Sequence, residues 1–458
     1  MITYNFAEVS GPLYLYLYKC LKNDILSGKL KPGTKLPSKR TFADNNGIST
    51  ITIQNAYDQL ISEGYVYTIT KKGYYVSNIQ GMEPIRSNHN VDLKIKVTED
   101  KGYYDFSSNR IDPDNFPFSV WTKMSREVLS NQKDELMEVA PTSGVKELRK
   151  AIAKHLQSFR GMNVDPNQIV IGAGTEYLYS LLIELLGDNK NYSIENPGYK
   201  KLDELYRRKN INCSYVAIDD CGAMIDELEK AQTDVAHICP NHHYPTGITM
   251  PASRRYELLG WANKSKGRYI IEDDYDSEFR MDGKPIPTLF SIDACEKVIY
   301  MNTFSKSLSP TIRISYMVLP AHLANEFYER MAIYSCTVSN FEQYTLARFI
   351  SEGYFEKHIN RMRLHYSKKR KRVIDIIRNN IACDILENEA GLHFLIKIDT
   401  DISDEKIIAK FEKNGMTISA LSDYYFEKEY ERQHYFIINY SSLDEEMLLK
   451  ALPLFKSE

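Results

Sequence analysis

The chain has 458 residues, a mass of 53.0 kDa and a formal net charge of −3, and this length predicts more than one domain. Its 43% hydrophobic and 26% charged residues fit a folded globular protein and argue against wholesale disorder. No apolar run approaches 18 residues, the N-terminus lacks the features of a signal peptide, and the seven scattered cysteines include no CxxC pair. We therefore expect a cytoplasmic protein without a membrane segment, a disulfide framework or a metal site.

Positive charge is concentrated at the N-terminus. Residues 1–80 contain nine Lys and Arg against five Asp and Glu, whereas the remainder contains 49 against 56. A basic head on an acidic body is compatible with a nucleic-acid contact confined to the N-terminus. Sampling variation in a short segment explains the same numbers, so charge alone leaves both interpretations open.

The first eighty residues predict three helices followed by a β-hairpin. Apolar residues repeat every four positions from Leu13 to Ile25, which favours a helix over 13–27 despite the strand-like LYLYLY. A second helix is expected from an N-cap at Ser38 to residue 45, and a third from Ser49 to a stop at Gly64. The β-rich runs 65–70 and 74–77 flank a basic tip. This order is typical of a winged helix-turn-helix domain, and the alternative is a small helical domain with a solvated polar face.

The predicted third helix and the hairpin tip supply candidate DNA contacts. Hydrogen-bonding side chains at the start of that helix suit base edges and phosphates, and basic side chains nearby suit phosphates. The candidates are Arg40, Ser49, Thr50, Thr52, Gln54, Lys71, Lys72 and Gly73.

Residues 29–76, KLKPGTKLPSKRTFADNNGISTITIQNAYDQLISEGYVYTITKKGYYV, resemble the winged-helix domain of GntR-family bacterial repressors. The matching positions are Gly28, Pro32, Gly33, Leu36, Pro37, Ser38, Arg40, Gly47, Ser49, Thr52, Ala56, Tyr57, Leu60, Glu63 and Gly64. The resemblance implies binding to a double-stranded operator with two half-sites. The family usually has Arg where this chain has Thr50, which implies one fewer phosphate or base contact.

Beyond a polar linker with one short strand at Leu93–Val97, helical segments alternate with short apolar runs. The runs are 169–171, 191–194, 235–239, 269–271 and 298–301, and the amphipathic stretches include 146–159 and 176–186. This alternation predicts an α/β domain with a mostly parallel sheet, in which ligands bind at the carboxyl ends of the strands. A basic run at 368–372 lies in a helical context and is interpreted as a solvated helix face.

The residues that follow the apolar runs together satisfy the needs of pyridoxal phosphate (PLP). The cofactor requires a lysine for an imine, a carboxylate at the ring nitrogen and a donor to the phenolate oxygen, which Lys306, Asp273 and Tyr275 supply. It also requires an aromatic ring to stack against and an anion cup at a glycine turn. For these parts the candidates are Tyr199, Gly174, Thr175, Glu176, Thr303, Ser305 and Arg313. A lone lysine is usually a surface charge, so the prediction of a PLP site rests on all these residues occurring together, in this order, after the apolar runs.

NTFSKSLSPTIRISY, IEDDYDSEF, ENPGY and HHYPTG are similar to motifs of fold-type I aminotransferases over residues 105–458. Joined to a GntR-type head, this combination resembles the MocR/GabR subfamily of transcriptional regulators. The resemblance implies a winged helix-turn-helix domain (1–78, α+β), a linker (79–104) and an α/β fold-type I PLP-binding domain (105–458). It also implies a head-to-tail homodimer that senses a small-molecule effector, and it gives the cofactor residues named above the same roles. HHYPTG further predicts a cis Tyr244–Pro245 bond.

Three departures from the family concern the ligand side of the site. Ile437 occupies the place of the Arg that grips a ligand carboxylate, and Lys201, an effector-contact candidate, occupies that of a second Arg. Val139 lies near the place of a tyrosine that the partner subunit lends to the phosphate. Other residues that could replace the missing Arg are Arg110, Arg432 and His434.

These observations leave three functional hypotheses. The first, which we favour, is a regulator that holds PLP and responds to a ligand. The second is an active aminotransferase with a DNA-binding head, which the loss of the carboxylate clamp disfavours because misalignment costs orders of magnitude in rate. The third is a regulator with a vestigial domain, which the intact lysine, aspartate and phosphate set disfavours. The effector is expected to be PLP itself or an amino compound, with a preference for PLP.

Overall fold

The computed structural model describes residues 2–6, 9, 11–79, 104–107, 112–281, 286–386, 390–428, 431–441 and 443–456. The chain divides into two compact units, Met1–Thr98 and Glu99–Glu458, and each is described by itself. The predicted linker lies almost entirely outside the described residues, as does the strand expected at Leu93–Val97. The domain boundaries at 78 and 104 therefore stay predictions.

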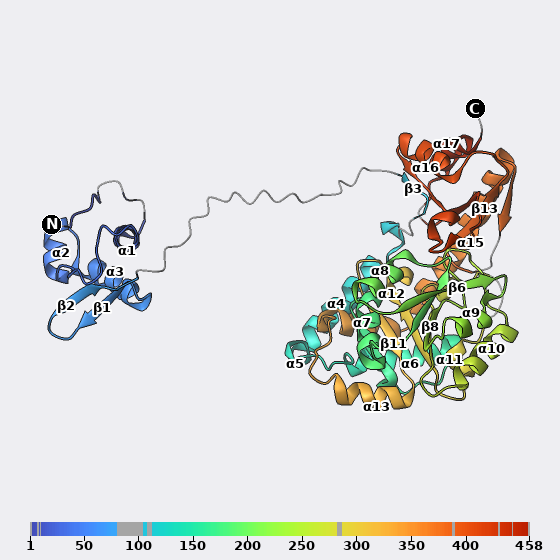
Figure 1. Cartoon of the computed structure of the whole chain (residues 1–458), viewed down its shortest axis with the longest axis horizontal. Helices are drawn as coiled ribbons and strands as arrows, with labels where there is room; N and C mark the ends of the chain where they lie inside the picture. The colour runs from blue at the N-terminus through green and yellow to red at the C-terminus, as the bar shows by residue number, and fades with distance from the viewer. Residues whose placement is uncertain are drawn as a thin grey trace. The chain divides into compact units, whose positions relative to one another are not determined.

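The N-terminal unit contains three helices and a two-stranded antiparallel hairpin (Figure 1). Its elements are α1 (Leu13–Leu26), α2 (Lys39–Asn46), α3 (Thr50–Ser62), β1 (Val66–Ile69) and β2 (Gly73–Val76). The expected elements are thus confirmed, with ends that differ by one or two residues.

Local signals and one shared core explain these helices. The Ser38 and Ser49 hydroxyls each accept a hydrogen bond from the backbone N–H three residues on, at 3.1 Å, and so cap α2 and α3. Gly47, at φ 66°, ends α2 in the left-handed conformation that glycine adopts without strain. The four-residue repeat of α1 then packs against the apolar stripe of α3, and Leu17 and Ile53 are fully buried there. This packing presents the opposite side of α3 to solvent.

A sheet of eight strands, among the described residues, forms the centre of the second unit. Its order is β4 (Ile169–Gly172), β11 (Ser315–Val318), β10 (Val298–Thr303), β9 (Tyr269–Asp273), β8 (Val235–Ile238), β5 (Tyr192–Asn196), β6 (Cys213–Asp219) and β7 (Gly222–Ala223). The five strands from β10 to β6 run parallel to one another, and β11, β4 and β7 pair antiparallel. Each apolar run predicted from the sequence lies in one of these strands, so the mostly parallel sheet is confirmed.

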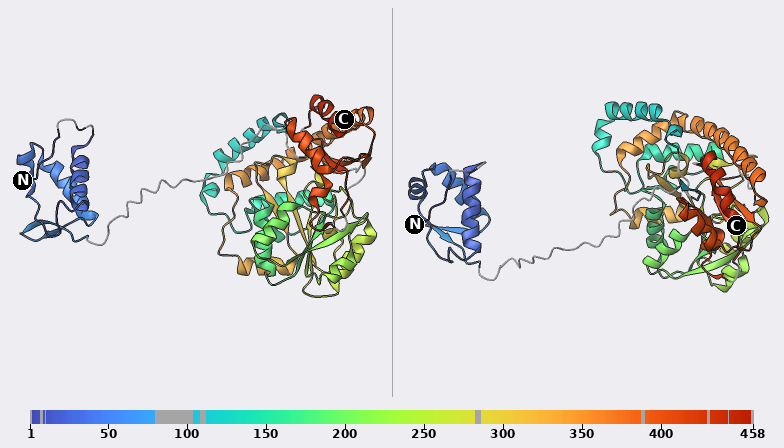
Figure 2. Two further views of the ribbon diagram at one scale, coloured as in Figure 1. Left: turned by 45° about the horizontal axis from the view of Figure 1, so that its top comes forward. Right: turned by 90° about the horizontal axis from the view of Figure 1, so that it is seen from above.

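Helices cover both faces of this sheet (Figure 2). Successive strand residues point to opposite faces, and in β10 Ile299 and Met301 enter one core while Val298 and Tyr300 face the other. One face is covered by α7 (Thr175–Leu186), α8 (Lys200–Arg208) and α13 (Ala321–Arg330). The other is covered by α4 (Phe118–Asn131), α5 (Lys133–Met137), α6 (Lys146–Arg160), α9 (Ile225–Lys230), α10 (Ala252–Asn263), α11 (Leu289–Ile292) and α14 (Asn340–Ser351).

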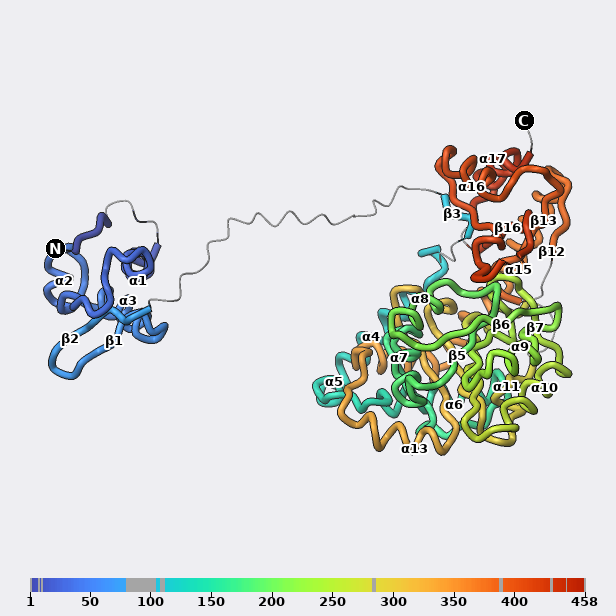
Figure 3. Tube along the Cα trace, in the orientation of Figure 1, coloured from blue at the N-terminus to red at the C-terminus, as the bar shows by residue number. Residues whose placement is uncertain are grey.

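A separate C-terminal layer follows the long helix α15 (Tyr354–Asn380), and the sequence analysis did not anticipate it. Its antiparallel sheet has the order β12 (Cys383–Leu386), β13 (His393–Ile398), β16 (Tyr435–Asn439) and β15 (Ser419–Ala420). The layer also contains α16 (Asp404–Lys413) and α17 (Glu445–Ala451). In addition, β14 (Met416–Thr417) pairs with β3 (Tyr104–Asp105), which brings the start of the unit beside its end (Figure 3).

The basic run 368–372 lies on α15, as expected, where Lys369 is half-buried and donates to the carbonyl of Ser441. Among the helices of the described ranges, none combines the length and the apolar character needed to cross a membrane.

Candidate cofactor site and DNA-binding surface

One pocket of about 390 Å³ lies where the carboxyl ends of β9 and β10 meet the N-terminus of α7. Its lining includes every predicted cofactor residue except Gly174, which directly precedes Thr175 in that lining, and it also includes Lys201. The other lining residues are Ser107, Tyr179, Leu202, Cys239, Tyr244, Asp276, Pro310, His393 and Asn439. The structure thus brings together side chains that lie far apart in the sequence.

Lys306 lies on the short helix α12 (Phe304–Ser307), directly after β10. The Thr303 hydroxyl accepts a hydrogen bond from the Ser305 N–H at 3.1 Å and caps this turn. Burial lowers the pKa of the Lys306 ammonium, nearby Asp276 opposes that shift, and the positive charge of Lys201 adds to it. A lowered pKa increases the neutral amine fraction, which is the nucleophilic form that an aldehyde requires.

Asp273, at the end of β9, offers one free carboxylate oxygen to the pocket. Its Oδ2 accepts a hydrogen bond from the Tyr179 hydroxyl at 2.5 Å and lies 3.6 Å from Nε2 of His237. Its Oδ1 is buried and has no hydrogen-bond partner among the described residues. A buried carboxylate oxygen without a partner is costly. The protonated ring nitrogen of PLP would supply the missing donor, so this carboxylate fits the cofactor.

The turn from Gly174 into α7 forms a cradle for an anion. Gly174 has φ 94°, and a Cβ atom there would lie 2.2 Å from Nη2 of Arg313, so only glycine leaves room for the guanidinium. The first N–H groups of α7 have no partner within the helix and point toward the turn. A phosphate fits both features, which supports the predicted roles of Gly174, Thr175 and Arg313.

The side chain of Glu176 adds a competing anion to this cradle. Its Oε2 accepts a hydrogen bond from Nη2 of Arg313 at 2.8 Å. Burial alone would raise the pKa of Glu176, but hydrogen bonds from its own backbone and from Arg313 outweigh that effect and lower it. The carboxylate of Glu176 therefore competes with a bound anion both for its own backbone N–H and for the Arg313 guanidinium.

Tyr199 and Tyr275 provide the aromatic part of the pocket. Tyr199 directly precedes α8, is 42% exposed and packs edge-on against Tyr244, with ring centroids 6.0 Å apart. Burial of its hydroxyl raises the pKa of Tyr199 to about 12. The Tyr275 hydroxyl is 3.3 Å from Nδ1 of His242. The Tyr244–Pro245 bond is cis, as predicted from HHYPTG, and Asn196–Pro197 is also cis.

The ligand side of the pocket lacks a carboxylate clamp within the described residues. Ile437, on β16, is fully buried in an apolar cluster with Leu395 and Leu421. Arg432 and His434 do not line the pocket, since Arg432 faces Asp220 at 3.7 Å and His434 approaches Asp404 at 3.4 Å. Arg110 lies outside the described residues. On this side the pocket lining thus includes a cation, Lys201, and a neutral amide, Asn439.

Comparison with protein families matches two segments of the chain. Residues 13–76 match the bacterial regulatory proteins of the gntR family, and residues 101–452 match aminotransferase class I and II. An HTH-type transcriptional regulator of Bacillus subtilis, YdeL, is 36% identical over 90% of this chain and 89% of its own length. The probable rhizopine catabolism regulatory protein MocR of Rhizobium meliloti is 27% identical and covers 98% of this chain and 94% of its own length.

The chain belongs to the MocR/GabR subfamily of GntR-family transcriptional regulators. The pyridoxine biosynthesis regulator PdxR of Corynebacterium glutamicum is likewise similar, with 27% identity over 88% of this chain and 86% of its own. The fold of the second unit is that of solved aminotransferases. A kynurenine aminotransferase of Pyrococcus horikoshii superposes with a TM-score of 0.68 at 22% identity, covering 77% of this chain and 89% of its own. The regulator is thus a PLP-dependent DNA-binding protein built on an aminotransferase fold.

In the DNA-binding unit of the regulator, the predicted contact residues fall into two groups. Arg40, Thr50, Gln54, Lys71 and Lys72 are exposed, with the two lysines at the wing tip. Ser49 and Thr52 differ from this expectation, because their hydroxyls lie 2.8 Å apart and Ser49 also caps α3. Their first role is therefore to hold the start of the helix, which leaves fewer free donors for bases than the sequence suggested.

Sequence reasoning missed three further residues on this surface. Ile51, on the first turn of α3, is 69% exposed and offers an apolar contact that suits a thymine methyl group. Lys35 lies beside the wing at Gly73, and Lys39 lies over the Tyr74 ring at 5.8 Å. The sequence could have indicated Ile51, because it is an apolar residue between Thr50 and Thr52, two polar residues at the start of the predicted third helix.

In the cofactor pocket, the missed residues hold the predicted ones in place. The Tyr179 hydroxyl donates a hydrogen bond to Asp273, His237 lies 3.6 Å from the same oxygen, and His242 contacts Tyr275. The motif HHYPTG marked the region of His242, but a lone histidine or a helical tyrosine carries no local sign of what it will contact.

Proposed function

We propose that the regulator holds PLP on Lys306 and changes its DNA binding with the occupancy of this pocket, with PLP itself as the effector. When bound, PLP contributes an aldehyde carbon that primary amines attack. Asp273 holds the proton of the ring nitrogen, Tyr275 faces the phenolate oxygen, Tyr199 covers the ring, and the α7 turn with Thr303, Ser305 and Arg313 receives the phosphate.

The observation that carries this proposal is the contrast between the two halves of the pocket. The cofactor half contains a partnerless carboxylate oxygen, a glycine cradle and a buried lysine with a lowered pKa. In the ligand half, the place of the carboxylate-gripping arginine is an apolar cluster around Ile437. A site complete for PLP and incomplete for amino acids favours a PLP sensor over an aminotransferase. The similarity to a regulator named for pyridoxine biosynthesis points in the same direction.

A second candidate effector is an amino compound with an anionic group. It is favoured by Lys201, which lines the pocket together with the Tyr199 and Tyr244 rings. Lysine provides a single point charge rather than the two-pronged contact of arginine, so such a ligand would be held less rigidly. In both cases we expect at most weak transamination.

We also propose that the regulator acts as a head-to-tail homodimer that places two DNA-binding units on two half-sites. Met137, Val139 and Ile333 of the aminotransferase-like unit are 73%, 79% and 84% exposed. A hydrogen bond joins the two segments that carry them, since the Thr142 hydroxyl lies within hydrogen-bond distance of the carbonyls of Met331 and Tyr334. Exposed apolar residues in neighbouring segments support burial against a second copy.

The central test compares cofactor-free and PLP-loaded protein for binding to DNA from the flanks of its own gene. We expect yellow holoprotein, a covalent mass increase after borohydride reduction that Lys306→Ala abolishes, and at least a tenfold change in DNA affinity on adding PLP. A response only to an added amino compound would favour the second effector. Release of a keto acid with full conversion of the visible band by common α-amino acids would favour the enzyme. A reduced mass adduct that persists in Lys306→Ala would contradict the assignment of the lysine.

A further inference from the structure

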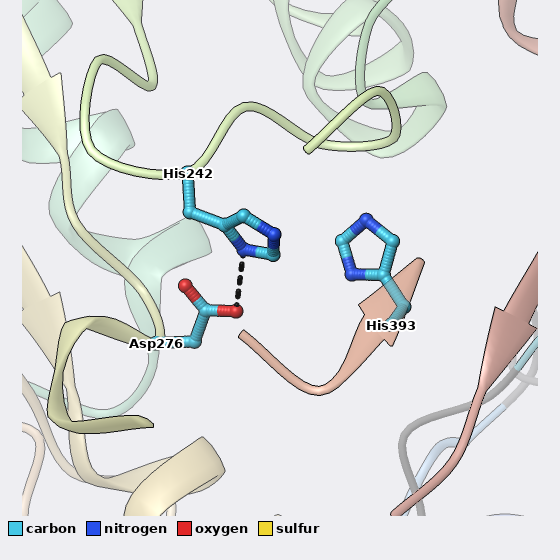
Figure 4. Close-up of side chains that lie close together, drawn as sticks. All are labelled: His242, Asp276 and His393. Carbon is cyan, nitrogen blue, oxygen red and sulfur yellow. Dashed lines mark hydrogen bonds and ion pairs between the residues drawn. The ribbon is translucent and has the colours of Figure 1, made fainter. Parts of the chain in front are cut away.

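A buried histidine–aspartate pair lies directly behind Tyr275. His242, in the loop after β8, places its Nδ1 2.8 Å from Oδ2 of Asp276 and 3.3 Å from the Tyr275 hydroxyl (Figure 4). Both side chains of the pair are almost inaccessible to solvent, at 2% and 3% exposure. The roles assigned above to the cofactor site use Tyr275 but neither member of this pair.

The C-terminal layer closes over the pair. The His393 ring, at the start of β13, lies beside the His242 ring, with centroids 4.7 Å apart and the ring planes tilted by 45° (Figure 4). Gly391 makes this approach possible, because a Cβ atom there would lie 1.9 Å from Cε1 of His242 and 2.7 Å from Oδ2 of Asp276. The pair is therefore shielded from water, and its hydrogen bonds act at low dielectric.

The partners of the two imidazoles determine which ring nitrogens carry hydrogen. A carboxylate only accepts, so Nδ1 of His242 donates to Asp276. Nε2 of His393 lies 3.1 Å from the carbonyl oxygen of Pro245 and donates to it for the same reason. Burial, together with the neighbouring His242, lowers the pKa of His393 well below its ordinary value, which keeps this ring neutral. Nε2 of His242 is buried without a partner among the described residues, consistent with its being the unprotonated nitrogen.

This assignment fixes the direction of the Tyr275 hydroxyl. A nitrogen that already carries hydrogen cannot accept one, so the Tyr275 O–H has no acceptor on His242 and turns toward the pocket. We propose that His242 and Asp276 are positioning residues that direct the Tyr275 hydroxyl proton to the phenolate oxygen of PLP. The inference rests on PLP binding as proposed above, and it adds a function for two residues outside the cofactor's own contacts.

Without the carboxylate, His242 is free to take the other tautomer, accept the Tyr275 proton on Nδ1 and withdraw it from the cofactor. A hydrogen bond donated to an anionic oxygen stabilises the deprotonated chromophore, so its loss raises the pH at which the visible band changes. The titratable groups around Tyr275 that bear on this pH are Asp273, Asp276, Cys239, Tyr244 and His242, together with Lys306. Removal of a nearby negative charge acts in the opposite direction, which makes the sign of the change diagnostic.

The experiment is a pH titration of the visible absorbance of the holoprotein, of four variants at Tyr275 and Asp276, and of one surface control. We expect Tyr275→Phe and Asp276→Ala each to raise the apparent pKa of the chromophore by about one pH unit, a tenfold change in proton affinity. The double variant should show no increase beyond Tyr275→Phe alone, because the upward effect of Asp276→Ala passes through the tyrosine. Asp276→Asn keeps an oxygen that accepts from Nδ1 and should not raise the pKa. The control Glu296→Gln alters a surface carboxylate paired with His322 at 2.9 Å and should change nothing.

Equal downward changes in Asp276→Ala and Asp276→Asn would show that only the charge matters and would overturn the inference. So would an upward effect of Asp276→Ala that persists in the Tyr275→Phe background. If Asp276→Ala does not fold, two-bond 1H–15N spectra of histidine-labelled wild-type holoprotein decide the matter. They should show His242 protonated on Nδ1, and a hydrogen on Nε2 alone would refute the assignment. A wild-type protein without a visible band would instead contradict the proposed function itself.

Discussion

Gly174→Ala should separate the stability of the α7 turn from its capacity to hold a phosphate. The backbone at Gly174 has φ 94° and ψ 161°, a region essentially reserved for glycine, so alanine there costs about 1–3 kcal/mol of folding free energy. The new Cβ would also lie 2.2 Å from Nη2 and 2.7 Å from Cζ of Arg313, which forces the guanidinium out of the cradle. Loss of one charge-assisted hydrogen bond to the phosphate is worth about 1.5–3 kcal/mol, or roughly a 10- to 150-fold weaker PLP affinity.

The matched control is Gly187→Ala at the other end of the same helix. Gly187 has φ 105° and ψ 141°, and its added Cβ would meet only the Asn189 side chain, at 2.9 Å. Calorimetry should therefore show a similar loss of stability in both variants. PLP titration monitored by absorbance should show weaker binding only in Gly174→Ala. Equal PLP affinities in the two variants, at equal loss of stability, would refute the conclusion that this turn holds the phosphate.

Three further predictions concern other charged groups. Glu176→Gln should tighten PLP binding by up to about fivefold, since an exposed ion pair with Arg313 is worth roughly 0.2–1 kcal/mol. Weaker binding in the absorbance titration would contradict the conclusion that Glu176 competes with the phosphate for Arg313. Arg40→Ala should lower by about one the slope of log affinity against log salt concentration for operator DNA, and Thr50→Arg should raise it by about one. Unchanged slopes would exclude both positions from phosphate contact. Burial lowers the pKa of His358 to about 4. Between about pH 4 and 6.5 the unfolded state therefore binds more protons than the folded state. As a result, the free energy of unfolding decreases as the pH drops through that window. His358→Gln should remove about 1 kcal/mol of the loss between pH 7.5 and 5.5, measured by thermal unfolding, and an identical pH profile in the variant would show that another group is responsible.

Short-range sequence patterns were enough to predict the helices, caps and strands that depend on residues close together in the chain. The helix spacing of residues 13–25, the caps at Ser38 and Ser49, and the apolar runs followed by polar residues each carry their signal within a short window. The placement of Lys306 and Asp273 in one pocket follows from the same reasoning, because parallel strands present their carboxyl ends at one edge.

The rest depends on contacts between distant segments, for which the sequence offers no local signal. Tyr179 reaches Asp273 across 94 residues and His393 reaches Pro245 across 148, and nothing beside either residue indicates its partner. The C-terminal layer was missed because its central strands, β13 and β16, pair antiparallel although α16, β14 and β15 lie between them in the sequence. Ser49 and Thr52 were assigned to DNA because their polar character was visible, whereas their bond to each other was not.

The pairing of β3 with β14 connects the start of the second unit to the lining of the pocket. The described part of this unit begins at Tyr104, in this two-residue strand. Phe106 is anchored on both sides, since its N–H donates to the carbonyl of Thr417 and its carbonyl accepts from the N–H of Asn439. Ser107, the next residue, lines the pocket. The pocket and the first described residues of this unit therefore share one backbone segment of four residues, so a ligand that displaced Ser107 would also act on β3 and on its pairing with β14.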